Sequence, residues 1–356
     1  MREIDRVINF WRAAHAAGRR SALATVVYVE GHGYRRPGAR MLVTEGGRSV
    51  GAVSGGCVER AVAHTAERVL AAGRPEMLVY DGRYRLGCAG SLHVLVEPLA
   101  PPHPEAFFAA YAKTRGADLS GGFTVTSRAH VPPVAAGGDE PAPDGLGSVF
   151  TFDGERFAAR PELREDPTAR LLFELVDDIP PAPRLIAVGA ERDAVALASL
   201  AAAQGWGATL VTHPRNPLDR LDDVRVQPVD PPELLGHVRA DPQTAVVLMT
   251  HNYARDLAYL RSLARAPELG YLGLLGPADR RDRLIDDLAE AEPLLPAWFD
   301  DRVYGPAGLD LGGELPEQVA LSIMSEVVAV FAGRPVPHLR DKRGDVHEAP
   351  LEPART

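Results

Sequence analysis

The chain has 356 residues, which favours two domains at roughly 150 residues per domain. Hydrophobic residues make up 46% of the chain and charged residues 24%, a composition that excludes global disorder. The formal net charge of -9 gives no support for a nucleic-acid partner, so any anion site has to be local.

The N-terminal segment and the cysteine content predict a cytoplasmic protein. Arg2, Glu3 and Asp5 interrupt the apolar block that a secretory signal needs. The longest uncharged stretch, residues 194–212, is rich in alanine and interrupted by glycines, so we expect a helix, a turn and a strand there and no membrane span. Two cysteines are too few for a disulfide scaffold and fit a reducing cytosol.

Residues 1–147 predict an α+β domain. Apolar residues recur at helical spacing before Gly18, and again from Val58 to Leu70, where Gly73 supplies the stop signal. Between and after these helices, short apolar runs predict strands at residues 22–29, 41–44, 49–54, 77–81 and 92–97. A third helix near 104–114 and a strand near 123–126 are expected to complete the domain.

Changes in composition predict the remaining boundaries. The Pro-rich segment 132–147 is expected to be a surface loop, and the Pro-rich break at 178–183 is expected to separate two domains. Residues 148–183 would form a connecting strand and helix, and residues 336–356 a polar tail.

Residues 184–335 predict a Rossmann-like domain with a doubly wound parallel sheet, because short apolar strands alternate with helices there. The expected strands are residues 185–188, 209–212, 245–250 and 271–275. The expected helices are residues 192–204, 253–264, 277–289 and 316–331. The whole chain is therefore expected to be of the α/β class.

Two short motifs in the first half predict a local anion site. RRPGAR (35–40) precedes a strand pair, and SGGC (54–57) opens the second helix. Glycines let the backbone approach a ligand closely, and unpaired amides at a helix start favour anions. Arg35, Arg36 and Arg40 would add bidentate contacts to a phosphate. An equally weighted alternative is that Arg36 and Arg40 pair with acidic neighbours and that SGGC is only a tight turn.

The two cysteines are interpreted individually. Cys57 stands where the helix begins, a position that stabilises a thiolate, although a small thiol buried beneath the glycine turn is the alternative. Glu59 is expected either to complement the helix dipole or to accept hydrogen bonds from a ligand. Cys88 lies in GCAG, five residues before His93. No paired CxxC spacing supports zinc, so we expect two thiols near one ligand pocket and no metal.

The first turn of the Rossmann-like region departs from a dinucleotide fingerprint. Only Gly189 of the fingerprint remains, and Glu191 and Asp193 stand where a pyrophosphate requires small or neutral groups. His213 takes the place of the ribose-binding acid. These departures argue against NAD(P) binding.

Three polar residues follow a later strand of the same region. Thr250, His251 and Asp256 are expected to face the crevice beyond the strand ends, where ligands bind in open α/β sheets. The alternative for Asp256 is a structural role, as a partner of Arg255 or of a helix N-terminus.

Five segments, in this order, resemble the XdhC/CoxI family of accessory proteins for molybdenum hydroxylases. They are RRPGARMLVTEGGRSVGAVSGGCVE, LGCAGSLHVLVEP, VVLMTHNYARDLAYLRSLA, GYLGLLGP and YGPAGLDLGGELPEQVALSIMSEVVAV. The resemblance implies a homodimer of two-domain chains that binds molybdenum cofactor, as molybdopterin or its cytosine dinucleotide. It also implies exchange of an oxo for a sulfido ligand with a cysteine desulfurase, and delivery to the apo-hydroxylase.

Matching by motif supplies the expected site residues. No catalytic residue is assigned, and Cys57 is the candidate sulfur relay. Residues expected to contact the cofactor are Arg36, Arg40, Ser54, Gly55, Gly56, Cys57, Glu59 and Cys88. The chain departs from the family at Ala89, which replaces a glycine, and at GAERD, where members show GAGHV.

Residues and resemblance converge on one hypothesis: a cytoplasmic chaperone that shelters an anionic, sulfur-sensitive pterin cofactor. One alternative is an NAD(P)-dependent oxidoreductase that uses the C-terminal domain. Another is a scaffold that contacts the hydroxylase without binding the cofactor.

Overall fold

A computed structural model describes residues 3–31, 35–81, 90–99, 123–131, 147–152, 155–158, 170–179, 183–292, 294–333 and 340. Contacts within the chain divide it into two compact units, with the division between Pro181 and Ala182. This division lies inside the Pro-rich break at 178–183. The expected helix at 104–114, the loop at 132–146 and the tail at 341–356 lie outside the described residues.

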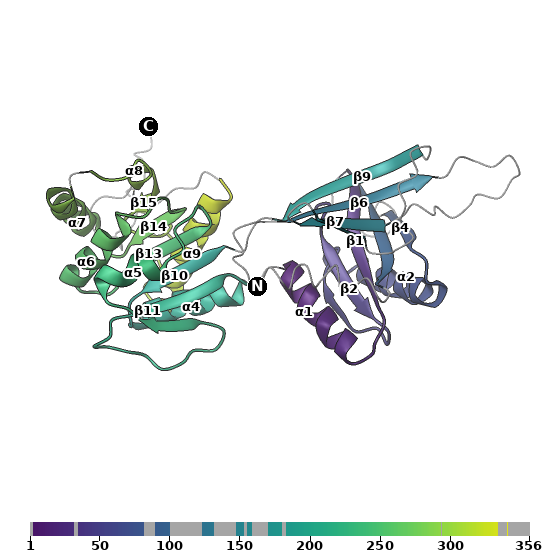
Figure 1. Cartoon of the computed structure of the whole chain (residues 1–356), viewed down its shortest axis with the longest axis horizontal. Helices are drawn as coiled ribbons and strands as arrows, with labels where there is room; N and C mark the ends of the chain where they lie inside the picture. Colours follow the sequence, from purple (N-terminus) through teal and green to yellow (C-terminus); the bar gives the residue numbers. More distant parts are fainter. Residues whose placement is uncertain are drawn as a thin grey trace, which may run out of the picture. The chain divides into compact units, whose positions relative to one another are not determined.

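The first unit contains a five-stranded antiparallel sheet between two helices. Its strand order is β3-β2-β1-β5-β4. The strands are β1 (Ser21–Gly31), β2 (Arg40–Thr44), β3 (Ser49–Gly51), β4 (Glu76–Asp81) and β5 (Gly90–Leu99). The helices are α1 (Glu3–Ala16) and α2 (Glu59–Ala72), which lie on opposite faces of the sheet (Figure 1).

The side chains of β1 alternate between the two faces of the sheet and show which helix covers each face. Leu23 packs with Trp11 and the other buried apolar residues of α1, while Ala22 and Ala24 pack with Val62 and its neighbours on α2. Successive side chains of a strand point to opposite faces, so a central strand with apolar residues on both faces requires a cover on each side. The predicted α+β arrangement of this region is confirmed.

A second antiparallel sheet follows in the same unit, with strand order β8-β7-β6-β9. Its strands are β6 (Phe123–Val131), β7 (Gly147–Phe152), β8 (Glu155–Ala158) and β9 (Arg170–Ile179). The expected helix within residues 148–183 is wrong for 170–179, which pair with β6 along its whole length. The pairing partner lies some forty residues earlier, and local periodicity carries no sign of it.

The two sheets of the first unit are joined by a buried carboxylate. Glu97 on β5 is fully buried and accepts hydrogen bonds from the amide of Ser148 on β7 (3.0 Å) and from its hydroxyl (2.5 Å). Buried Val27 and Leu95 pack with Leu175 of β9 beside this contact. Apolar contacts and the two hydrogen bonds of Glu97 thus join the two sheets.

The second unit is a doubly wound sheet of six parallel strands within the described residues, with order β12-β11-β10-β13-β14-β15. The strands are β10 (Arg184–Val188), β11 (Gly207–Thr212), β12 (Arg225–Pro228), β13 (Thr244–Leu248), β14 (Tyr271–Leu274) and β15 (Val303–Tyr304). Numbered from its own first strand, the order is 3-2-1-4-5-6, the arrangement of dinucleotide-binding folds. The predicted Rossmann-like domain is confirmed.

Helices cover both faces of this sheet (Figure 1). One face carries α4 (Arg192–Ala203) and α9 (Pro316–Phe331). The other carries η1 (Pro231–Glu233), α5 (Leu234–His237), α6 (Tyr253–Leu263), α7 (Ala278–Ala291) and α8 (Phe299–Arg302). Sequence periodicity missed the short elements β12, β15, α5 and α8, because two to four residues are too few to establish a periodic pattern. In the described part of the chain, no helix has the length and apolarity needed to cross a bilayer.

We predict that Glu97→Ala destabilises the first unit by about 2 to 4 kcal/mol, because it leaves the buried amide and hydroxyl of Ser148 without their acceptor. Urea unfolding followed by circular dichroism measures the loss. Glu76→Ala on neighbouring β4 is the control, since Glu76 pairs with Arg68 at the surface. Equal stabilities of the two variants would contradict the role of Glu97.

Candidate functional site

The SGGC turn before α2 is fixed by two side chains that accept from its own backbone. The Glu59 carboxylate accepts from the amides of Val53 (3.2 Å) and Ser54 (2.8 Å) and from the Ser54 hydroxyl (2.5 Å). Ser54 Oγ in turn accepts from the amides of Gly56 and Val58, each at 3.1 Å. Amides that the sequence assigned to an anionic guest therefore bind the chain itself.

Glu59 is held ionised by this arrangement. Burial raises its pKa, but the hydrogen bonds from the Ser54 hydroxyl and from the amides of Ser54, Glu59 and Val53 outweigh burial and lower it below its ordinary value of 4.5. A carboxylate that accepts several backbone hydrogen bonds is stabilised in its charged form. The turn thus carries a built-in negative charge beneath its surface.

The surface of the turn is formed by Gly55, Gly56 and Cys57, which are all exposed. The Cys57 thiol donates to Ser54 Oγ at 3.7 Å, so the side chain is positioned by the same hydroxyl that organises the turn. Gly56 has a φ of 118°, in the region that favours glycine. No described residue accepts from the amides of Gly55 or Cys57. These two amides and the sulfur are therefore the groups of the turn that could contact a ligand.

The three arginines of RRPGAR occupy different environments. Arg35 donates to the carbonyl of Ala52 from Nε (3.3 Å) and from a terminal nitrogen (3.2 Å), which ties this segment to the strand end before SGGC. Arg40 is only 4% exposed and donates to the carbonyl of Gly38 (2.9 Å). Arg36 is exposed. Of the arginines, Arg36 is the one whose exposure suits contact with an anion.

The structure describes only some of the residues expected to form a second thiol site or a zinc site. Cys88 lies outside the described residues. His93 packs edge-to-face against the Tyr28 ring, with the ring centroids 5.3 Å apart. The described residues contain no group of three or more His, Cys, Asp and Glu that could hold a metal ion.

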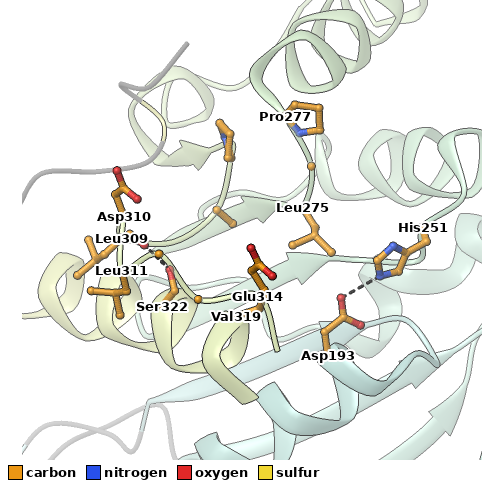
Figure 2. A pocket seen from close by; sticks show the side chains of 15 residues that line it. Asp193, His251, Leu275, Pro277, Leu309, Asp310, Leu311, Glu314, Val319 and Ser322 are labelled. Carbon is orange, nitrogen blue, oxygen red and sulfur yellow. Dashed lines mark hydrogen bonds and ion pairs between the residues drawn. The ribbon is translucent and has the colours of Figure 1, made fainter. Parts of the chain in front are cut away.

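The second unit has a cavity of about 390 Å³ at the carboxyl ends of its parallel strands. The order of the sheet reverses between β10 and β13, and open α/β sheets bind ligands in the crevice at such a point. Figure 2 shows Asp193 and His251 on one side of this cavity, Asp310 and Leu309 on the other, and Glu314 between them.

Asp193 and His251 are hydrogen-bonded at the edge of the cavity, with His251 Nε2 2.8 Å from Asp193 Oδ2. His251 has a φ of 53°, a left-handed conformation in which histidine is enriched over most residues. The sequence expected His251 to face the crevice, and the structure places it there. It missed the pairing with Asp193, which comes from a helix almost sixty residues earlier.

The turn at the start of α4 suits a pyrophosphate poorly. Gly189 is required because a Cβ atom would lie 2.6 Å from the carbonyl oxygen of Met249. Asp193 Oδ1 accepts from the amide of Ala194 (3.0 Å), so it already uses one of the amides at the helix start. Two like charges about 4 Å apart repel by about 4 kcal/mol at an effective dielectric constant of 20. The carboxylate therefore opposes a phosphate at this position.

Asp256 serves the structure of the unit and not the cavity. It is 2% exposed, and its Oδ1 accepts from the hydroxyl (2.6 Å) and the amide (3.2 Å) of Thr250. Its Oδ2 accepts from Arg280 of α7 at 2.7 Å. The sequence left a structural role open and named Arg255 as a partner, but the partner is Arg280. Arg280 is distant in sequence and gave no signal.

A buried carboxylate on α9 holds the wall of the cavity. Glu326 is fully buried, and one of its oxygens accepts from the Tyr271 hydroxyl (2.6 Å) and from the amide of Gly308 (2.8 Å). Burial raises the pKa of Tyr271 well above its ordinary value, and Glu326 raises it further. Sequence reasoning missed this residue, although an acid within the apolar run SIMSEVVAV is a signal that could have revealed it.

Comparisons with known proteins identify the family. The XdhC and CoxI family pattern matches residues 14–81, and the XdhC Rossmann domain pattern matches residues 185–327. A probable xanthine dehydrogenase subunit of Bacillus subtilis (strain 168) is 32% identical over 333 residues, which cover 86% of this chain and 92% of that protein. The chain belongs to the XdhC/CoxI family.

Two further relatives show how far the XdhC/CoxI likeness extends. The molybdenum cofactor insertion chaperone PaoD of Escherichia coli (strain K12) is 26% identical over 330 residues, which cover 91% of this chain and 87% of that protein. A crystal structure of a xanthine dehydrogenase from Bacillus halodurans superposes with a TM-score of 0.72 at 24% identity, covering 92% of this chain and 96% of that one. The fold is shared over almost the full length.

In this XdhC/CoxI chain, the residues expected to contact a cofactor fall into three groups. Four are exposed, namely Arg36, Gly55, Gly56 and Cys57. Three are occupied by hydrogen bonds within the chain, namely Arg40, Ser54 and Glu59. Cys88 lies outside the described residues. The predicted site residues thus separate into exposed residues and residues that hydrogen-bond within the chain, and their contact with a cofactor stays a prediction.

We predict that Glu59→Gln lowers the free energy of unfolding by about 1 to 3 kcal/mol at about pH 7, because a neutral amide has one acceptor oxygen where the carboxylate has two. The folded pKa of Glu59 is depressed, so its contribution is fully present above about pH 4.5 and is lost as the pH falls through the folded value. Urea unfolding at about pH 7 and about pH 3 measures this, with exposed Glu67→Gln as control. If the difference in free energy of unfolding between the wild type and Glu59→Gln were the same at both pH values, the prediction would be contradicted.

Proposed function

We propose that this chain binds molybdenum cofactor in the cytoplasm and acts as a maturation chaperone for a xanthine dehydrogenase-type molybdenum hydroxylase. Two relatives support the proposal by name, a molybdenum cofactor insertion chaperone and a protein named as a probable subunit of xanthine dehydrogenase. The finer steps of the proposal are protection of the cofactor, sulfuration with a cysteine desulfurase and delivery to the apo-hydroxylase. A homodimer is the proposed state of the chain.

The observation that carries the proposal is the exposed Cys57 thiol on a turn that the chain itself holds rigid. Thiolate is a soft ligand, and soft ligands suit sulfur-rich transition-metal centres. The amides of Gly55 and Cys57 and the exposed guanidinium of Arg36 are donors for a phosphate. The donor set therefore fits a cofactor that carries both a metal dithiolene and a phosphate.

The hydrogen bonds of this turn divide its backbone amides into two groups. Glu59 and Ser54 accept from the amides of Val53, Ser54, Gly56 and Val58, and leave the amides of Gly55 and Cys57 for a guest. When bound, the cofactor would supply the molybdenum centre that the hydroxylase needs. The chain would supply only a donor for the phosphate and a thiol at the metal end.

The NAD(P)-dependent oxidoreductase alternative has less support. Glu191 and Asp193 stand at the start of α4, and Asp193 uses an amide that a pyrophosphate would need. We therefore do not propose hydride transfer.

We predict that the full chain, purified from cells that make molybdenum cofactor, retains pterin and molybdenum, and that Cys57→Ala lowers both by about tenfold or more. Oxidation to a fluorescent pterin and elemental analysis give the two readings. Arg36→Ala is expected to weaken retention, with exposed Arg19→Ala as matched control. Absence of cofactor from the wild-type chain and from all variants would overturn the proposed function.

The sulfur relay has a separate test. Incubation with a cysteine desulfurase and free cysteine is expected to add one sulfur atom to Cys57, located by mass spectrometry of peptides. The peptide that carries Cys88 serves as the internal comparison. Cofactor retention without any added sulfur on Cys57 would leave the binding role standing and remove the relay.

A further inference from the structure

The cavity of the second unit has a chemistry that the proposed function does not use. Fifteen residues line it, including three acids and one histidine, and none of these fifteen is a lysine or an arginine. Its volume of about 390 Å³ lies at the small end of the roughly 300 to 1,000 Å³ of small-molecule pockets. The space suits a ring system or a nucleoside.

The walls of the cavity are mostly apolar. They are formed by Leu275, Pro277, Pro306, Leu309, Leu311 and Val319. Figure 2 shows Leu275 on the side of the cavity opposite Val319. Apolar walls with a few placed polar groups are typical of sites for flat, uncharged ligands, whose faces need burial and whose edges need partners.

The three carboxylates of the lining are hydrogen-bond acceptors, while the Ser322 hydroxyl donates to the carbonyl of Leu309. Asp193 has both oxygens engaged, by the amide of Ala194 and by His251. Glu314 lies at the start of α9, where its amide donates to Gln318 Oε1 (3.0 Å) and fixes its backbone. The Glu314 side chain is exposed, and no described residue pairs with its carboxylate. This carboxylate is the acceptor that the cavity offers to a ligand.

We propose that this cavity is a binding site for a flat heterocycle with a 2-amino-4-oxopyrimidine edge, and that Glu314 accepts the two adjacent N–H groups of that edge. A carboxylate binds two parallel N–H donors in the same way that it binds a guanidinium. The ring faces would pack on Leu275 and Val319. Phosphate is excluded from the α4 turn by Asp193.

Pterins and guanine share this edge, and the experiment separates the two sources. The full chain is titrated with pterin by fluorescence, and with guanosine, inosine and NAD+ by calorimetry. Inosine differs from guanosine only by the missing 2-amino group. We expect pterin, guanosine or both to saturate a single site, inosine to bind at least about tenfold more weakly than guanosine where guanosine binds, and NAD+ to give no saturable signal. Binding of only one of the two compounds shows whether the ligand of the cavity is a pterin or a guanine nucleoside.

Variants test the location of the site. Glu314→Gln replaces one acceptor oxygen with a donor and is expected to weaken ring binding about tenfold. Glu317→Gln is the matched control, since Glu317 lies one turn along α9, carries the same charge and does not line this cavity. Leu275→Trp is expected to fill the cavity and abolish binding, and circular dichroism checks its folding. If Leu275→Trp fails to fold, the Glu314→Gln comparison decides.

Three results would overturn the inference: no binding of pterin or guanosine to the wild-type chain, equal binding of guanosine and inosine, or equal affinities of Glu314→Gln and Glu317→Gln. Cys57→Ala is expected to leave ring binding unchanged. The two proposals can therefore fail separately. If the chain retains no cofactor but still binds the ring, only the proposed function is overturned.

Discussion

The Glu59 carboxylate is the constraint on which the first unit's site depends. A negative charge at the start of α2 is favourable for the helix dipole, and here it is also satisfied by backbone amides of the turn that precedes the helix. Ser54 extends the same arrangement by accepting from two further amides. The consequence is a turn whose interior is complete without a ligand and whose surface keeps Cys57 exposed.

The acidic residues of the second unit have two roles, one in the buried core and one at the edge of the cavity. Asp256 and Glu326 are buried and hydrogen-bonded, and each ties a loop at the carboxyl edge of the sheet to a helix. Asp193 and Glu314 stand at the edge of the cavity and set its preference for donors. The fold is that of a dinucleotide-binding protein, while the charges at its crevice favour a different ligand. Fold and ligand preference are thus independent here, as the general behaviour of such folds leads one to expect.

The sequence predicted most of the fold because its information is local. The short apolar runs of the first sheet and the alternation of strands and helices in the second unit can be recognised over a few residues, and the observed elements agree with them. Strand β9 was missed because its identity depends on pairing with β6, far along the chain. The same limit applies to the site. Cys57 was found by its motif, but the pairs Asp193–His251 and Asp256–Arg280 are distant in sequence and are set by three-dimensional proximity, which a single sequence does not report.

The contact of Glu326 with Gly308 has a bearing on how a guest enters the second unit. One carboxylate oxygen holds the amide of Gly308 and the Tyr271 hydroxyl together, and the Ser322 hydroxyl donates to the carbonyl of Leu309 beside them. The chain segment that forms one side of the crevice is thereby anchored to the core of the domain before any guest arrives. Association then requires no ordering of that segment, so little conformational entropy is lost in the encounter.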